Sequence, residues 1–136
     1  MSPTSQANGR YGMGKSVPLA YEQAVARTRA ALQQEGFGIL TEIDVKAPLR
    51  KKLDVDFRKY VILGACNPSL AYQGFQAEPD IGLLLPCNVI VYEQEPTRCR
   101  VAILDPVVQL SITERNDIEP LARQAKQRLE RALAAI

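Results

Sequence analysis

Residues 21–45 read YEQAVARTRAALQQEGFGILTEIDV, and the hydrophobic period changes within this stretch. Apolar or small residues recur every three or four positions up to Glu35, which predicts an amphipathic helix. Gly36 is suited to the residue after a helix, where φ is often positive. Residues 37–45 then alternate, which predicts a strand with one buried face and with Glu42 and Asp44 on its wet face. Such a carboxylate pair is typical of a solvated strand, although its spacing also suits acid–base chemistry.

The same two patterns extend in both directions from this segment. The apolar stripe from Ile118 to Ile136 predicts a second long helix, and period-two or β-rich segments precede it. We therefore expect helices near 18–35 and 117–136, and strands near 10–17, 37–45, 57–65, 87–93 and 99–104. This order (β-α-β4-α) predicts a two-layer α+β fold, with a mostly antiparallel sheet and both long helices on one face. Residues 1–9 are polar and are expected to form a disordered tail, which leaves 10–136 as a single domain.

Composition limits the kinds of partner. The chain has 136 residues and a net charge of +2, without the large basic excess of a nucleic-acid-binding domain, so no nucleic-acid partner is expected. No signal-like N-terminus and no apolar run of membrane-spanning length is present, so we expect no membrane partner and a cytoplasmic location.

The chain contains no histidine, which removes Ser-His-Asp and Cys-His catalysis and the commonest metal ligand. Its three cysteines form no CxxC motif and, in a reducing compartment, are expected to be free thiols. Cys99 is expected to be a packing residue. The sequence identifies no cofactor and leaves open whether the protein is an enzyme.

Two Cys-Asn dipeptides are the strongest candidates for a site. They occur in Gly64-Ala65-Cys66-Asn67-Pro68 and Leu85-Pro86-Cys87-Asn88, each at a predicted strand end beside a proline. If the two strands are antiparallel, both thiols lie at one corner; a parallel crossover would separate them. The candidate ligand-binding residues are Cys66, Asn67, Cys87 and Asn88, with Cys66 and Cys87 as candidate metal ligands. The alternative is that both cysteines simply pack as small apolar side chains.

These two motifs, together with residues 35–45 and 77–93, resemble the domain of unknown function 302 (DUF302) family. The resemblance implies a β-α-β4-α fold related to the TATA-binding-protein-like or helix-grip group, and a homodimer. It implies no activity or cofactor. It favours the antiparallel arrangement, in which the Cα atoms of Cys66 and Cys87 lie within about 4–8 Å.

Three functions remain open from the sequence. The first is a module that binds a small molecule or a metal near the two Cys-Asn corners or under the last helix. The second is a structural homodimer with packing cysteines. The third is a thiol-dependent enzyme or redox protein, which would need a cation or a helix N-terminus to activate the thiol.

Overall fold

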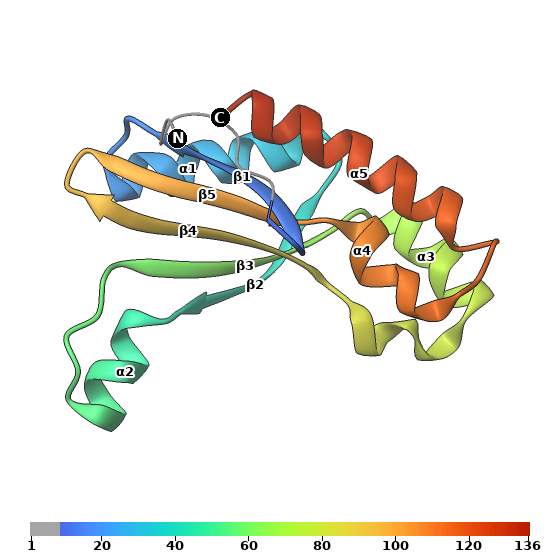
Figure 1. The fold of residues 1–136 in the computed structure, drawn as a ribbon, viewed down its shortest axis with the longest axis horizontal. Coiled ribbons are helices and arrows are strands. Elements are labelled where there is room, and N and C mark those ends of the chain that lie inside the picture. The colour runs from blue at the N-terminus through green and yellow to red at the C-terminus, as the bar shows by residue number, and fades with distance from the viewer. Residues whose placement is uncertain (1–8) are drawn as a thin grey trace.

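The computed structural model describes residues 9–136 (Figure 1), so the expected tail, apart from Gly9, lies outside the described residues. Five strands and two long helices appear in the predicted order, with shorter helices between them. The elements are β1 (Gly12–Val17), α1 (Tyr21–Gln34), β2 (Gly38–Asp44), α2 (Lys46–Leu53), β3 (Tyr60–Cys66), α3 (Pro68–Ala77), the 3-10 helix η1 (Pro79–Leu84), β4 (Cys87–Glu95), β5 (Arg98–Leu104), α4 (Pro106–Leu110), the 3-10 helix η2 (Ser111–Thr113) and α5 (Glu119–Ala134).

The strands form one sheet in the order β1-β5-β4-β3-β2, and every neighbouring pair is antiparallel. This confirms the predicted α+β fold. The register places Val61, Val91 and Val101 side by side on one face of the three central strands. Tyr60, Tyr92 and Arg100 therefore share the opposite face, because successive side chains alternate across a strand.

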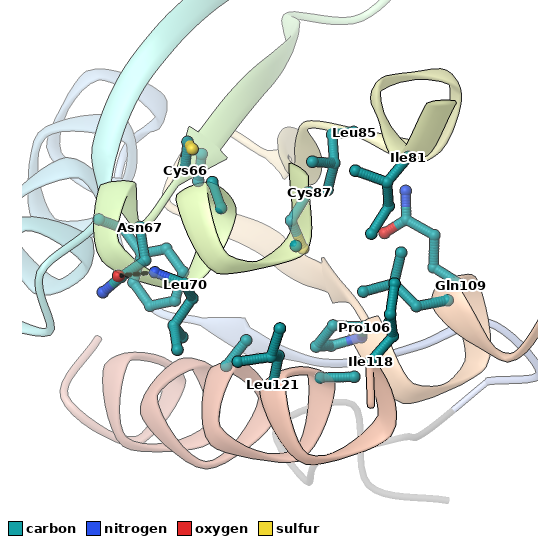
Figure 2. Close-up of a pocket in the computed structure, with 17 residues that line it drawn as sticks. Cys66, Asn67, Leu70, Ile81, Leu85, Cys87, Pro106, Gln109, Ile118 and Leu121 are labelled. Carbon is teal, nitrogen blue, oxygen red and sulfur yellow. Dashed lines mark hydrogen bonds between the residues drawn. The ribbon is translucent and has the colours of Figure 1, made fainter. Parts of the chain in front are cut away.

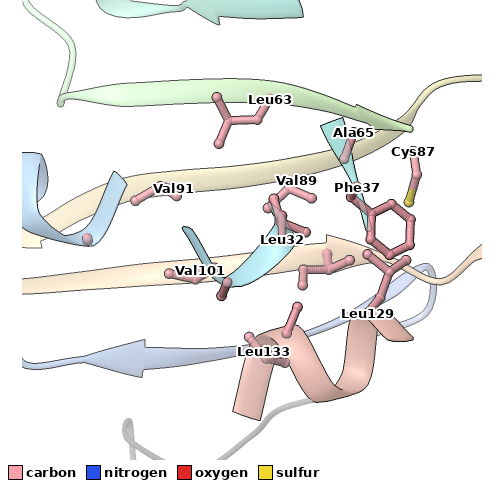
Figure 3. Close-up of a cluster of buried hydrophobic side chains, with 14 of the residues drawn as sticks. Leu32, Phe37, Leu63, Ala65, Cys87, Val89, Val91, Val101, Leu129 and Leu133 are labelled. Carbon is pink, nitrogen blue, oxygen red and sulfur yellow. The ribbon is translucent and has the colours of Figure 1, made fainter. Parts of the chain in front are cut away.

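The core lies between the first of these faces and the two long helices, α1 and α5 (Figure 3). Alternate residues of β3, β4 and β5 are fully buried there, as their period-two patterns predict. Leu32 of α1 and Leu129 and Leu133 of α5 pack against them with almost no exposure. The second face of the sheet carries no helix layer in the part of the chain that the structure describes, and we call it the open face.

A glycine ends α1, as the sequence predicts. Gly36 has a φ of +85°, and its N–H donates to the carbonyl of Gln33 at 3.0 Å. The next amide, from Phe37, donates to Leu32 O at 2.9 Å and returns the chain into β2. This pattern of carbonyl pairing is typical of a helix that closes on a left-handed residue.

The predicted alternation of β2 is wrong beyond Ile39. The pairing with β3 shifts between Ile39 and Thr41, so Ile43 turns to the open face, where it is 51% exposed. Glu42 and Asp44 lie on the helix side instead, because an extra residue in a strand exchanges its two faces. Glu42 forms an ion pair with Arg29 of α1, and Asp44 accepts a hydrogen bond from the Lys46 amide at 3.0 Å. Both carboxylates therefore serve local structure.

Two helix starts also differ from the prediction. The helix expected near 18–35 begins at Tyr21, after Ala20. The helix expected near 117–136 begins at Glu119, after Ile118. Asp117 binds the Arg115 guanidinium at 2.8 and 2.9 Å.

The shorter helices occupy two places. α3, η1 and α4 gather beyond one end of the sheet, beside the N-terminal half of α5, whereas α2 projects from the other end and buries no residue (Figure 1). No helix within residues 9–136 is long and apolar enough to cross a membrane.

Candidate functional site

A cavity of about 60 Å³ lies where the ends of β3 and β4 meet the short helices and α5 (Figure 2). It is partly open to the surface, and its wall is almost entirely apolar. The lining residues come from five stretches of the chain: Phe37, Ala65, Cys66, Asn67, Leu70, Ala71, Gly74, Ile81, Leu85, Cys87, Pro106, Gln109, Leu110, Ile118, Leu121, Ala122 and Ala125.

The structure brings the two Cys-Asn segments together at this corner. Ala65 pairs directly with Cys87 in the antiparallel ladder, so Cys66 is one residue beyond the position opposite Cys87. The two cysteine side chains leave the sheet on opposite faces, because Cys87 shares a face with Ala65. Figure 2 shows the Cys87 sulfur turned toward the cavity and the Cys66 sulfur turned away from it. The backbone arrangement is the one expected, but only one of the two thiols enters the cavity.

The two asparagines have different surroundings. Asn67 is buried, and its Oδ1 accepts a hydrogen bond from the Leu70 amide at 3.1 Å, which caps α3. Pro68 follows at the first helical position, where its missing N–H costs nothing. Asn88 is exposed and pairs with Gly64, on the open face and away from the cavity. Asn67 therefore fixes one wall of the cavity.

Gly64, from the first motif, packs closely against Pro86, from the second. A Cβ on Gly64 would lie 2.2 Å from Thr41 Oγ1 and 2.8 Å from Pro86 Cγ, which is closer than real side chains approach. Glycine is therefore required where Thr41 and Pro86 meet over β3. The Leu85–Pro86 peptide bond is cis.

Asp105 holds the opposite wall in place. Its Oδ1 accepts the Val107 amide at 2.9 Å and caps α4, while Oδ2 lies 2.8 Å from Lys126 Nζ of α5. One carboxylate thus starts α4 and ties it to the long helix. Pro106 follows at the first helical position and lines the cavity.

Gln109 supplies a polar atom of the cavity wall that has no partner. Its Nε2 donates to the Leu84 carbonyl and so joins α4 to η1. Its Oε1 is buried and has no hydrogen-bond partner. In Figure 2 this oxygen points toward the space between Ile81 and Cys87. A buried acceptor without a partner costs free energy, and a donor on a bound molecule would remove that cost.

The thiols are poor nucleophiles in this structure. Burial, and secondarily the charge of Asp105, raise the pKa of Cys87 to about 12. Its thiol donates to the Leu104 carbonyl, with the sulfur 3.4 Å from the oxygen. Burial also raises the pKa of Cys66, although α3 begins two residues later, and that of Cys99. All three remain protonated near neutral pH.

No group of three or more Cys, Asp or Glu side chains within residues 9–136 is arranged to hold a metal ion. The sulfurs of Cys66 and Cys87 also point to opposite faces of the sheet, so the two thiols do not converge on one position for a shared metal ion.

Sequence reasoning missed most of the cavity wall. Residues 107–112 are apolar and compatible with either a strand or a helix; Gln109 lies in this segment and Pro106 precedes it. In the structure both belong to α4. The Asp105-Pro106 pair is a cap followed by a first-turn proline, a helix-start signal that could have identified α4. Nothing in the sequence indicates that Gln109 faces a cavity.

Comparison with known proteins agrees with this fold. The family model described as "Domain of unknown function DUF302" matches residues 13–136. A crystal structure of an uncharacterized conserved protein DUF302 from Bacillus stearothermophilus is similar, with a TM-score of 0.84 and 26% sequence identity. The match covers 93% of this chain and 98% of that one. The curated proteins contain no significant match.

Proposed function

Because the chain belongs to the DUF302 family, whose description assigns no activity, we propose its function from the cavity: it binds a small, mainly apolar molecule that carries one hydrogen-bond donor. The supporting observation is the buried Gln109 Oε1, which lacks a partner in an otherwise apolar wall. The wall excludes water from most of the ligand, and the oxygen orients its single polar group.

The volume limits the ligand. A cavity of about 60 Å³ holds more than one water but is smaller than the engineered cavity of roughly 150 Å³ that admits benzene. It therefore accepts a molecule of a few heavy atoms, or the apolar end of a longer one that extends through the open side. A bound O–H or N–H would reach Gln109 between α4 and η1.

The thiol-dependent function has weaker support. Burial raises the pKa of each cysteine, and the cavity contains only the Cys87 sulfur, which already donates to Leu104 O. Metal binding by Cys66 and Cys87 is weakened by their opposite orientation. Of the three functions that the sequence left open, small-molecule binding keeps a specific structural feature in its favour.

Two probes of similar size test the proposal. We expect 1-butanol to shift the amide NMR signals of cavity residues saturably, and 1-chlorobutane, which has no donor, to bind about 2- to 12-fold more weakly. Gln109→Met should remove that difference. Gln73→Met is the matched control, because Gln73 also donates from Nε2 to a backbone carbonyl but lies outside the cavity wall. Equal binding of both probes by the wild type, or no saturable shift, would overturn the proposal.

We also propose a homodimer formed through β2, the edge of the sheet. In the described part of the chain β2 pairs only with β3, and it carries two exposed apolar side chains, Leu40 (67%) and Ile43 (51%). An unprotected edge with apolar side chains favours pairing with a second chain. The neighbouring α2, in which no residue is fully buried, would add contacts.

Sedimentation at tens of micromolar tests the dimer. Ile43→Lys should shift the protein to monomer, whereas Leu83→Lys, at a side chain that is 88% exposed in η1, should not. A wild type that sediments as a monomer would contradict the dimer. A cytoplasmic location, supported by the three free cysteines, is tested by cell fractionation.

A further inference from the structure

The open face of the sheet carries a groove of about 680 Å³ that the proposed cavity does not involve. The groove crosses neighbouring strands in the order β3, β4, β5 and the segment before β1. Its lining contains three arginines, three tyrosines and a phenylalanine, and no aspartate or glutamate: Gly9, Arg10, Tyr11, Phe57, Arg58, Tyr60, Ile90, Tyr92, Arg100 and Ala102.

Aromatic rings form a row at one end of this groove. Tyr60 and Tyr92 are cross-strand partners, and their rings stack with centroids 5.2 Å apart at 7°. The Phe57 ring lies 6.1 Å from that of Tyr60. Arg58 sits over both Phe57 and Tyr92, with its guanidinium carbon 6.0 and 5.6 Å from the ring centroids. Tyr11, from the segment before β1, is 72% exposed.

Beside the rings, the groove is lined by Arg100 and by aliphatic side chains of β4 and β5. Arg100 pairs with Tyr92 on one side and with Ser16 of β1 on the other, so it continues the row of rings across the sheet. A Cβ on Gly14 would lie 2.8 Å from Arg100 Nη2, so glycine lets the guanidinium lie close against β1. Ala102 and Ile90 line the groove beside it.

We propose that this groove binds single-stranded nucleic acid. Aromatic rings on an open sheet stack unpaired bases, and arginines along the same surface bind the phosphates. Neighbouring strands are about 4.8 Å apart, so the four positions span roughly 14 Å, on a sheet of the kind that stacks two or three bases. From the net charge of +2 we expected no nucleic-acid partner. A net charge describes the whole chain, however, and does not reveal that three arginines from distant segments line one groove.

The charge distribution favours nucleic acid over a second copy of the chain. A two-fold contact through this groove would bring Arg10 and Arg58 of both chains together, and the lining contains no carboxylate that could separate these charges. A dimer through β2 leaves the groove free, since β2 contributes none of its residues.

Fluorescence anisotropy with a labelled oligouridylate or oligothymidylate of about twelve nucleotides tests the proposal. We expect saturable binding whose affinity falls with salt at a log–log slope of about −1.4, as expected for phosphate contacts by Arg10 and Arg58. Tyr92→Ala should weaken binding about 5- to 150-fold, and Tyr92→Phe should retain it. If Tyr92→Ala does not fold, Tyr11→Ala replaces it, because the ring of Tyr11 is largely exposed.

Arg58→Ala is compared with Arg123→Ala, which removes an equal charge from α5, outside the groove. We expect only Arg58→Ala to weaken binding and to make the salt slope less steep by about 0.7. Equal losses for the two variants would show general charge attraction and overturn the proposal. Unchanged binding by a folded Tyr92→Ala, no binding by the wild type, or equal competition by uridine monophosphate at the same nucleotide concentration would also overturn it.

Discussion

Gly74 offers a direct way to separate stability from ligand binding. It is a buried residue in the middle of α3, and it lines the cavity. A Cβ built there would meet Ile81 Cδ1 at 3.4 Å, which is ordinary van der Waals contact. Glycine within a helix costs roughly 0.5–1 kcal/mol relative to alanine, so Gly74→Ala should stabilise the free protein by about that amount.

The same methyl group should weaken ligand binding. It occupies part of a cavity of only about 60 Å³, so a bound molecule and the methyl must compete for space. Overpacking of this kind costs about 1–3 kcal/mol, which corresponds to an affinity roughly 5- to 150-fold lower. A variant that is more stable yet binds less cannot be explained by partial unfolding.

Urea unfolding and the 1-butanol titration measure the two effects separately. Gly82→Ala is the matched control, because its new Cβ would also have its nearest contact at 3.4 Å, with Phe75, but Gly82 does not line the cavity. We expect Gly82→Ala to bind like the wild type. The reasoning fails if Gly74→Ala binds 1-butanol with unchanged affinity, or if it unfolds at lower urea than the wild type.

Three further predictions concern the corner of β3 and β4. Gly64→Ala should destabilise by at least about 1–3 kcal/mol in urea, because the new Cβ would overlap Thr41 and Pro86; a neutral result would contradict the packing described. Asn67→Ala should cost about 0.5–2 kcal/mol and Asn67→Asp much less, since only the latter keeps the cap acceptor of α3, so equal losses would exclude the cap. The raised pKa of Cys87 means that the unfolded chain loses this proton first as pH rises, so stability should fall by about 1.4 kcal/mol per pH unit between pH 9.0 and about 12. Urea midpoints of Cys87→Ala across that range should show a correspondingly smaller slope, and an unchanged slope would assign the effect to other groups.

The fold could be predicted from the sequence because the hydrophobic residues of each long helix and strand recur with the period typical of that element. The stripe of α1 ends at a glycine, and the strands of the hairpin Cys87–Leu104 alternate without interruption until they reach Glu93. β2 shows where this reasoning fails. One extra residue near Leu40 exchanges the faces of Glu42 and Ile43, and no property of the individual residues marks a bulge.

The candidate site was predictable only in part, for a related reason. Cys66 and Cys87 were brought to one corner by strand pairing, which the sequence could anticipate. The face of the sheet to which each sulfur points depends on the register of strand pairing, because successive side chains alternate between the two faces. The sequence does not give this register. Gln109 was not identifiable, since its role depends on how α4 packs against η1 and α5, and these are contacts between segments far apart in the chain.

From the sequence, the two Cys-Asn motifs had two alternative explanations, a ligand-binding site or structural packing. The structure supports a combination of the two. Gly64 and Pro86 allow close packing at the end of the sheet, and Asn67 starts α3 at the same point. These are folding roles, but together they position α3 so that the cavity lies between it, α4 and α5. Cys87 closes the floor of that space with a protonated side chain that already has a hydrogen-bond acceptor, which leaves Gln109 Oε1 as the acceptor available to a ligand. Residues that serve packing thus define where a ligand can bind, and the residue that would recognise it lies outside both motifs.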